Sequence, residues 1–435
     1  MKNTFFISCP IDTYSGYGAR SRDFVKAVVE SDKYNVRILP QRWGNTPFGF
    51  IEDHKEEWGF LNDLIINQIP TKPDIWCQIT VPNEFQPVGK YNIGLTAGIE
   101  TTACVHSWIE GCNRMNLVLT SSEHSKKVFE NSKYKVKDQR TGNEIDLVLK
   151  TPVEVLIEGA DLDVYKPISV EEITSTDLFE SINSIPEKFA YLFVGHWMQG
   201  DIGEDRKNVG LTIKAFYETF KNKKNAPALI LKTSSGVSSY MDRRKIQNQI
   251  NIIRDTVGGN IIPNIYLLHG EFSNKEMNEL YNHPKVKAMV SLTKGEGFGR
   301  PLLEFSLTNK PIMTTGWSGH TDFLKPEFTA LMEGKLTNVH PSAANDFLIK
   351  ESQWFSVDHG YVGHFFNDIF KNYKDWKIKG KRQGYYSRTN FSFEQMKKQL
   401  ENILKDNIPE FPKEVKLKLP QIKKIELPKK EKVNG

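Results

Sequence analysis

The sequence predicts an α/β protein with two units, each built around a parallel sheet. Short runs rich in β-branched and aromatic residues alternate with segments of helical periodicity along most of the 435 residues, and this alternation is typical of βαβ units. The alternation stops in a polar stretch near residues 165–186 and then begins again. With 39% hydrophobic residues, the chain can form two or three domains that have their own cores.

The first series predicts a sheet of six strands with helices between them. The expected strands are residues 3–8, 34–40, 74–80, 90–98, 117–122 and 153–157. The expected helices are residues 19–31, 107–115 and 122–132. A polar insertion around Thr141-Gly142-Asn143 has the composition of a hairpin turn. We therefore expect an N-terminal Rossmann-like, acceptor-side domain over 1–170, with a hairpin insertion near 131–150.

The second series repeats the pattern and ends in a strongly amphipathic helix. The expected strands are residues 188–197, 226–234, 264–270, 286–292 and 311–315. The expected helices are residues 210–222, 243–257, 274–284, 301–309 and 392–405. This predicts a C-terminal Rossmann-like domain over 171–390 and a helix over 391–408 that packs back on one of the two units. Residues 409–435 then form a tail rich in lysine and proline.

Charge and cysteine content indicate a soluble, cytoplasmic protein. The net charge of +5 equals that of residues 413–435 alone, which hold eight lysines and three glutamates, so the remainder of the chain is balanced. The four cysteines show no Cys-x-x-Cys spacing and are typical of a reducing compartment. The amino terminus lacks the apolar core of a signal peptide, and no run reaches the length of a membrane span. The tail is expected to be solvated, or to contact an anionic surface weakly.

The stretch GEGFGRPLLEF, residues 295–305, carries the clearest chemical signal. Its three glycines are unfavourable in a helix, and Pro301 suits a first helical position. A strand, a glycine loop and a helix therefore follow one another, and such loops present backbone amides to phosphates or hydroxyl-rich ligands. Glu296 lies in this loop, and Glu304 is expected in the first helical turn, where it would also stabilise the helix dipole. A protein-kinase loop is excluded, because the lysine strand and the His-Arg-Asp and Asp-Phe-Gly motifs are missing.

Three cations are expected at the carboxyl ends of strands in the second unit. Arg206 and Lys207 precede a helix, and Lys232 ends an apolar strand. Carboxyl ends of neighbouring parallel strands meet at the ligand crevice of such sheets, where cations neutralise a diphosphate. For Arg206 and Lys207 alone, a solvated charged loop is the simpler interpretation.

The first unit offers two further candidates. Gly16 and Gly18 follow the first strand and would let amides approach a phosphate, although a plain tight turn is equally consistent. Glu100 follows the fourth strand and either faces the reacting centre or caps the helix after it. Asp161 and Asp163 fit a hinge turn better than a metal site, and no His/Cys set has zinc spacing, so no metal is expected.

Taken together, these motifs resemble the retaining GT-B glycosyltransferases, in particular glycosyltransferase family 4. Glu296 and Glu304 match the family's pair of glutamates separated by seven residues, with Gly-Phe-Gly-Arg-Pro between them. The segments NKPIMTTGWSGHTDFL, VEVLIEGADLDVYKP and FSFEQMKKQL resemble other family segments in the same order. The resemblance covers roughly residues 90–405. It implies two Rossmann-like domains that face each other across a donor/acceptor cleft.

The resemblance also implies a role for each residue in the glycine loop. Glu304 would bind the ribose hydroxyls of a nucleotide-diphosphate sugar, and Glu296 would contact the transferred sugar. The backbone at Gly297 and the amides at Phe298 and Gly299 would meet the sugar or the diphosphate.

The remaining candidates would surround the phosphates and the sugar. Arg206, Lys207 and Lys232 would hold the diphosphate, and Gly16 would approach it from the other domain. In many family members the arginine and lysine are several residues apart, whereas here they are adjacent. Glu100 stands roughly where many members have a histidine near the sugar.

The expected activity is hexosyl transfer from a UDP- or GDP-sugar to a hydroxyl, with retention of configuration and without metal or another cofactor. In such a design the leaving phosphate takes the acceptor proton. The acceptor would be a saccharide, a lipid-linked sugar or a protein. The alternatives are glycosylation of a modified nucleic-acid base, a nucleotide-sugar epimerase on the same fold, and a non-catalytic nucleotide- or glycan-binding protein.

Overall fold

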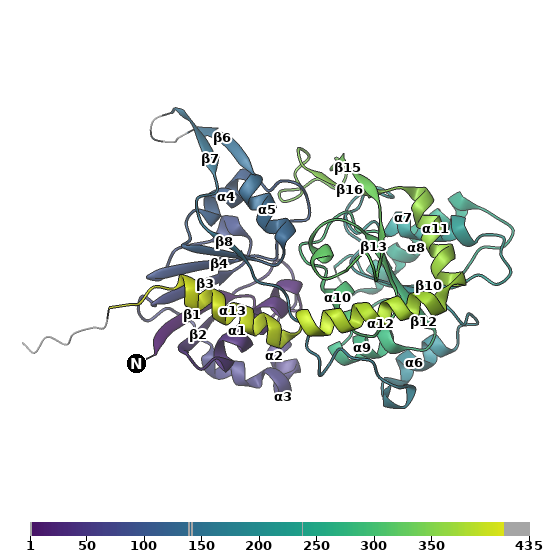
Figure 1. Ribbon diagram of the computed structural model, residues 1–435, viewed down its shortest axis with the longest axis horizontal. Helices are drawn as coiled ribbons and strands as arrows, with labels where there is room; N and C mark the ends of the chain where they lie inside the picture. Colours follow the sequence, from purple (N-terminus) through teal and green to yellow (C-terminus); the bar gives the residue numbers. More distant parts are fainter. Residues whose placement is uncertain (1, 138–139, 141, 237, 413–435) are drawn as a thin grey trace, which may run out of the picture.

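The computed structural model of the protein describes residues 2–137, 140, 142–236 and 238–412. Thr141 and the lysine-rich residues 413–435 lie outside the described part of the chain. Two α/β units lie side by side, one formed by the first part of the chain and one by the second (Figure 1). This arrangement confirms the predicted fold class.

The first unit is built on a six-stranded parallel sheet with the order β2-β1-β3-β4-β5-β8. Its strands are β1 (Asn3–Cys9), β2 (Tyr34–Pro40), β3 (Ile75–Ile79), β4 (Tyr91–Leu95), β5 (Leu117–Thr120) and β8 (Val153–Val155). Every residue of β3 and β5 is buried, because helices and loops cover both faces of a parallel sheet. The continuous apolar runs of the sequence therefore correctly predicted buried strands of a parallel sheet in this unit.

Helices of the first unit connect the strands and place polar loops at one edge of the sheet. They are α1 (Gly16–Glu30), α2 (Phe50–Asp53), α3 (Lys55–Trp58), α4 (His106–Cys112), α5 (Glu123–Asn131) and two short 3₁₀ helices, η1 (Gly59–Leu64) and η2 (Pro82–Glu84). The Ser15 side chain caps α1 by accepting from the amide of Gly18, and Ser122 caps α5 through Ser125. Both caps fix helix N-termini at the carboxyl ends of β1 and β5.

The second unit contains another six-stranded parallel sheet, with the order β11-β10-β9-β12-β13-β14. Its strands are β9 (Ala190–Val194), β10 (Ala228–Lys232), β11 (Ile265–Leu268), β12 (Val286–Ser291), β13 (Ile312–Thr315) and β14 (Ala330–Met332). The strand order reverses direction between β9 and β12, and ligands of open α/β sheets bind at such a switch point. The fold therefore directs attention to the loops after β9 and β12.

Helices cover both faces of this second sheet. They are η3 (Val170–Glu172), α6 (Thr176–Asn183), α7 (Val209–Phe220), α8 (Tyr240–Val257), α9 (Asn274–Asn282), α10 (Arg300–Ser306), η4 (Gly319–Asp322) and α11 (His359–Lys371). A ring cluster of Tyr191, Phe216, Phe220 and Phe366 packs β9 against α7 and α11. Fully buried aromatic side chains of this size dominate core stabilisation.

Two consecutive helices join the units. α12 (Tyr373–Asn390) runs along the second unit, and α13 (Phe393–Asn407) continues across to the first (Figure 1). Met396, Leu400 and Leu404 of α13 are buried in the core that β1, β3 and α1 form. Their spacing of four residues places them on one face of the helix. The C-terminal helix therefore completes the core of the first unit.

Two antiparallel strand pairs form small sheets separate from the two main sheets. β6 (Lys133–Lys137) pairs with β7 (Glu144–Val148) and projects away from the first unit (Figure 1). β15 (Gly334–Asn338) pairs with β16 (Gln353–Val357) beside the second unit. Within the described residues, no helix is long and apolar enough to span a bilayer.

Candidate active site

The candidate site lies where the two units meet, at the carboxyl ends of β9 and β12. The loop after β12 carries Glu296, and the segment before α7 carries Arg206 and Lys207. The amide of Lys294 donates to the carbonyl of Arg206 over 2.7 Å and so joins the two segments. Residues separated by about ninety positions in the chain are thereby fixed side by side.

Glu296 is the centre of an ion-pair network. Lys207 Nζ lies 2.6 and 2.7 Å from its two carboxylate oxygens, and Arg206 Nη1 lies 3.5 Å from one of them. Burial by itself raises the pKa of Glu296, but the charges of Lys207 and Arg206 outweigh that effect and lower the pKa to about 2. Glu296 is therefore an anion held by two cations in a buried site.

Arg206 also connects the two units. Its Nη2 lies 3.7 Å from the Glu100 carboxylate in the first unit, and its Nη1 donates to the Gly295 carbonyl over 2.9 Å. Burial lowers the pKa of Arg206, while Glu100 and Glu296 raise it more, so the net shift is upward. The helix after Glu100, α4, begins at His106 without any side-chain cap. Glu100 therefore faces the opposite domain and does not cap α4.

The glycines of the loop provide room for the other domain. A methyl group on Gly295 would lie 1.9 Å from the Glu100 carbonyl oxygen, and one on Gly297 would lie 2.5 Å from that of Ala97. No side chain fits at such distances. In this structure the backbone of the first unit occupies the space that we expected the ligand to use beside Gly295 and Gly297.

The last two residues of the loop are both buried and differ in backbone conformation. The ring of Phe298 is buried, with its centroid 5.0 Å from that of Phe323. Gly299 is the N-cap of α10 and has a φ of 96°, which strongly favours glycine. The side chain of Phe298 thus anchors the loop, and its amide and that of Gly299 lie at the start of α10.

Glu304 lies in the second turn of α10 and not in the first, because the helix begins at Arg300. One carboxylate oxygen accepts from Arg300 Nε over 3.0 Å, and the other accepts from the Tyr281 hydroxyl over 3.4 Å. Burial raises the pKa of Glu304, and the Arg300 charge opposes this. Its distance from the helix end excludes a role in stabilising the first turn, which was our alternative for this residue.

Lys232 lies apart from the Glu296 network. Its Nζ donates to the Gly270 carbonyl over 2.6 Å and lies 4.6 Å from the centroid of the Phe272 ring. His196, in the loop after β9, has its pKa lowered by burial and by the charges of both Lys207 and Lys232. Both lysines therefore lie close enough to His196 to lower the pKa of its imidazole.

Gly16 is the first residue of α1, in the other unit. It is exposed, and a methyl group there would meet no atom within 4 Å. Gly18 differs, because a methyl group would lie 2.3 Å from the Thr13 carbonyl oxygen. Gly18 therefore serves the turn, while the backbone at Gly16 is accessible at a helix N-terminus.

Several polar residues near the site were not singled out in the sequence. Arg300 contacts Asp23, Glu158 and Glu304, and His320 is fully buried close enough to Glu296 for each to affect the other's pKa. His320 Nε2 donates to the Thr315 carbonyl, and Nδ1 has no partner among the described residues. Arg300 directly follows the glycine loop, so its position in the sequence could have identified it as a candidate site residue. Asp23 lies in an otherwise ordinary amphipathic helix and gives no local signal.

The described residues contain no group of three or more His, Cys, Asp or Glu arranged to hold a metal ion. Asp161 instead accepts from the backbone amide of Asp163 over 2.8 Å, which is a turn contact.

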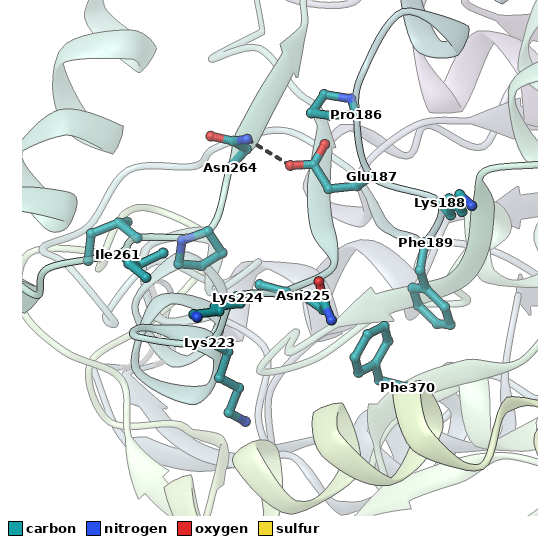
Figure 2. Close-up of a pocket in the computed structure, with 13 residues that line it drawn as sticks. Pro186, Glu187, Lys188, Phe189, Lys223, Lys224, Asn225, Ile261, Asn264 and Phe370 are labelled. Carbon is teal, nitrogen blue, oxygen red and sulfur yellow. Dashed lines mark hydrogen bonds between the residues drawn. The ribbon is translucent and has the colours of Figure 1, made fainter.

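A cavity lies at the opposite edge of the second sheet, among the described residues. It has a volume of about 530 Å³ and is lined by residues that precede β9, β10 and β11, together with Phe370 (Figure 2). Lys188, Lys223 and Lys224 line it, and Glu187 accepts a hydrogen bond from Asn264 over 2.7 Å (Figure 2). Because amino ends of parallel strands do not form the ligand crevice, we place the candidate site at the Glu296 network.

Comparisons by sequence found no matching family model and no matching curated protein. Comparisons by structure gave many matches. A glycosyltransferase from Rickettsia africae has a TM-score of 0.60 at 13% identity, over 94% of this chain and 99% of that one. Alr3699/HepE from Anabaena, solved in complex with UDP-glucose, has a TM-score of 0.61 at 12% identity, over 93% and 100%.

A third match supports the same fold. Sucrose-phosphate synthase from Thermosynechococcus elongatus has a TM-score of 0.58 at 11% identity, over 93% of this chain and 99% of that one. The similarity extends over nearly the whole of each chain. It confirms the expected GT-B architecture of two Rossmann-like domains.

Proposed function

We propose that the protein is a glycosyltransferase that moves a hexosyl group from a nucleotide-diphosphate sugar to an acceptor hydroxyl. The observation that carries this proposal is the buried Glu296–Lys207–Arg206 network at the switch point of a GT-B fold. Alr3699/HepE, which has this fold, was solved with UDP-glucose, and a trehalose-6-phosphate protein from E. coli was solved with UDP-2-fluoro glucose. A UDP- or GDP-sugar is accordingly the proposed donor.

The cations suit the leaving group. Cleavage of the sugar–phosphate bond leaves negative charge on the diphosphate, and preorganised cations and amides stabilise such charge by several kcal/mol per donor. Arg206 and Lys207 are already fixed by Glu296, so little reorganisation is needed when phosphate arrives. Lys232, on the neighbouring strand, would add a further positive charge.

The carboxylates suit the hydroxyl groups of the donor. A carboxylate has about four lone-pair sites, so Glu304 retains acceptor capacity beside Arg300 and Tyr281 and would bind the ribose hydroxyls. Glu296 would contact the transferred sugar in the same way. The amides of Phe298 and Gly299, and that of Gly16 from the first unit, would meet the sugar or the diphosphate.

We further propose that transfer retains the anomeric configuration and requires no metal. The leaving phosphate would accept the acceptor proton, and Glu100, beside Arg206, would lie near the sugar. The acceptor would be a saccharide, a lipid-linked sugar or a protein, and the cytoplasm would supply the donor. Residues 413–435 would give at most weak contact with an anionic surface.

The first test is a thermal-shift panel of UDP- and GDP-sugars, followed by measurement of nucleotide release with and without candidate acceptors. A true donor at a hundredfold excess over Kd should stabilise the protein by about 2.7 kcal/mol. Transfer to an acceptor would support the proposal. An altered sugar without an acceptor would indicate an epimerase, and a shift without turnover would indicate a binding protein.

Two substitutions test the site assignment. Glu304→Ala should weaken donor binding about tenfold or more, because it removes a charged hydrogen-bond acceptor. Lys232→Ala should lower turnover more than binding, because its charge is needed most as the leaving group departs. Glu218→Ala and Lys214→Ala are matched controls, since this pair is exposed on α7 with its charged atoms 3.9 Å apart. Unchanged donor affinity and turnover in both site variants would refute the assignment.

A further inference from the structure

Arg300 contacts carboxylates of both domains. Its Nη1 lies 2.6 Å from Asp23 and 3.9 Å from Glu158, both in the first unit. Its Nε lies 3.0 Å from Glu304, which is in the second unit. A single guanidinium therefore links α1 to the carboxylate that would bind the donor ribose.

The link is largely shielded from water. The exposed fractions of the Arg300, Asp23 and Glu304 side chains are 23%, 13% and 9%. Burial lowers the pKa of Arg300, but Asp23, Glu304 and Glu158 raise it more, and the residue stays cationic. A guanidinium is planar and presents its donors in a fixed fork. Fixing Nη1 on Asp23 therefore also fixes the direction in which Nε meets Glu304.

Asp23 is itself held on a rigid element. Arg20, three residues earlier on α1, donates to the carbonyl of Ile157 over 2.8 Å. Arg22 donates to the carbonyls of Ile11 and Thr13 over 2.9 and 3.0 Å. Both arginines are buried. These bonds anchor the first half of α1, so that Asp23 has little freedom to follow Arg300 if that residue moves.

We propose that Asp23 is a positioning residue for donor binding. It holds Arg300, which in turn orients the Glu304 carboxylate toward the ribose hydroxyls. Donor affinity in the second domain then depends on a side chain of the first domain. This inference rests on the proposed function, since it requires that Glu304 bind ribose.

The test compares two probes, UDP and 2′,3′-dideoxy-UDP, by isothermal titration calorimetry, with GDP and its dideoxy analogue as a second pair. The two members of each pair differ only in the ribose hydroxyls. If Glu304 binds those hydroxyls, the wild-type protein should prefer the ribose form about tenfold or more. In Asp23→Asn this preference should fall at least threefold, with little change in affinity for the dideoxy form.

Additional variants separate positioning from stability. Arg300→Lys keeps the charge but loses the fork, and Asp23→Asn should add no further loss in that background. Glu30→Gln is the matched control, because Glu30 is on the same helix and pairs with Lys397 over 2.7 Å. It should leave the preference unchanged. If Asp23→Asn does not fold, Asp23→Glu replaces it, with the expectation of a smaller loss of preference.

Each outcome has a distinct meaning. Loss of ribose preference in Asp23→Asn with a full binding stoichiometry would support the proposal. Equal loss of affinity for both probes, or a lower Tm with an unchanged preference, would overturn it and leave a structural role. A wild-type protein that binds both probes equally, or a Glu304→Ala variant with unaltered preference, would instead refute the proposed role of Glu304.

Discussion

The ionisation states of side chains at the candidate site are determined by neighbouring charges. Glu296 remains an anion because Lys207 and Arg206 outweigh the cost of its burial. Removal of one partner from a buried pair leaves an uncompensated charge, which commonly costs about 3–5 kcal/mol. The network is therefore fragile to single changes. Under the proposed function, a diphosphate would bring further negative charge to the same cations.

This pairing predicts a pH-dependent stability. The folded pKa of Glu296, about 2, lies below its ordinary value of 4.5. The carboxylate therefore contributes stability that is present above pH 4.5 and is lost as the pH falls toward 2. A shift of this size corresponds to about 3 kcal/mol. We expect Glu296→Gln to be less stable at neutral pH and to lose less stability on acidification, as measured by urea unfolding at several pH values. If the free energy of unfolding of the variant changes with pH in parallel with that of the wild type, this prediction is wrong.

At the scale of single elements, the glycine loop is defined by what lies against it. Gly295 and Gly297 approach the backbone of residues 97–100 more closely than any side chain allows. The loop therefore forms part of the domain interface as well as part of the candidate site. Phe298 keeps the loop in place by packing on Phe323.

Gly297→Ala should separate the units locally. Its methyl group would lie 2.5 Å from the Ala97 carbonyl oxygen, so that one domain must shift. We expect at least a tenfold loss of transferase activity, since misplacement by about 1 Å can cost a hundredfold in rate. Gly363→Ala is the control, because Gly363 is helical and a methyl group there would lie 3.3 Å from the Thr219 hydroxyl. Wild-type activity in Gly297→Ala would show that the observed approach of the two loops is not needed for turnover.

Elements with strong apolar periodicity could be predicted from the sequence, and others could not. The residues of α13 that face the first unit, Met396, Leu400 and Leu404, recur every four positions. The buried face of α12 consists mainly of Gly380, Gln383, Gly384 and Ser387. A methyl group on Gly380 would lie 2.7 Å from the carbonyl carbon of Lys310. Because α12 packs through small and polar residues, hydrophobic periodicity did not reveal it.

At the scale of the whole molecule, the two units contact each other through charge as well as through packing. Arg300 meets Asp23, Arg206 meets Glu100, and the amide of Glu123 donates to Asp322 over 2.9 Å. α12 and α13 run across both units (Figure 1). The two units are therefore coupled through several contacts at once.

The basic tail is a further whole-molecule feature, since residues 413–435 carry the entire net charge of +5. These residues lie outside the described structure. We expect their deletion to leave nucleotide affinity and activity on a soluble acceptor within about twofold of wild type. The same deletion should reduce any binding to anionic vesicles, which each lysine favours by roughly 1 kcal/mol. Loss of activity on a soluble acceptor would show that the tail has a role beyond surface contact.

The sequence by itself determined the fold class, because continuous apolar runs and amphipathic periods are local properties of the chain. It also determined the glycine loop that carries Glu296 and the helix that carries Glu304, because glycine and proline impose local conformation. Only the tertiary structure decided that Lys207 pairs with Glu296, that Glu100 faces Arg206, and that the loop glycines adjoin the first unit. It alone brought Asp23 to Arg300, which is 277 residues away. Such contacts depend on how the two sheets are placed, and no local pattern in the sequence encodes that placement.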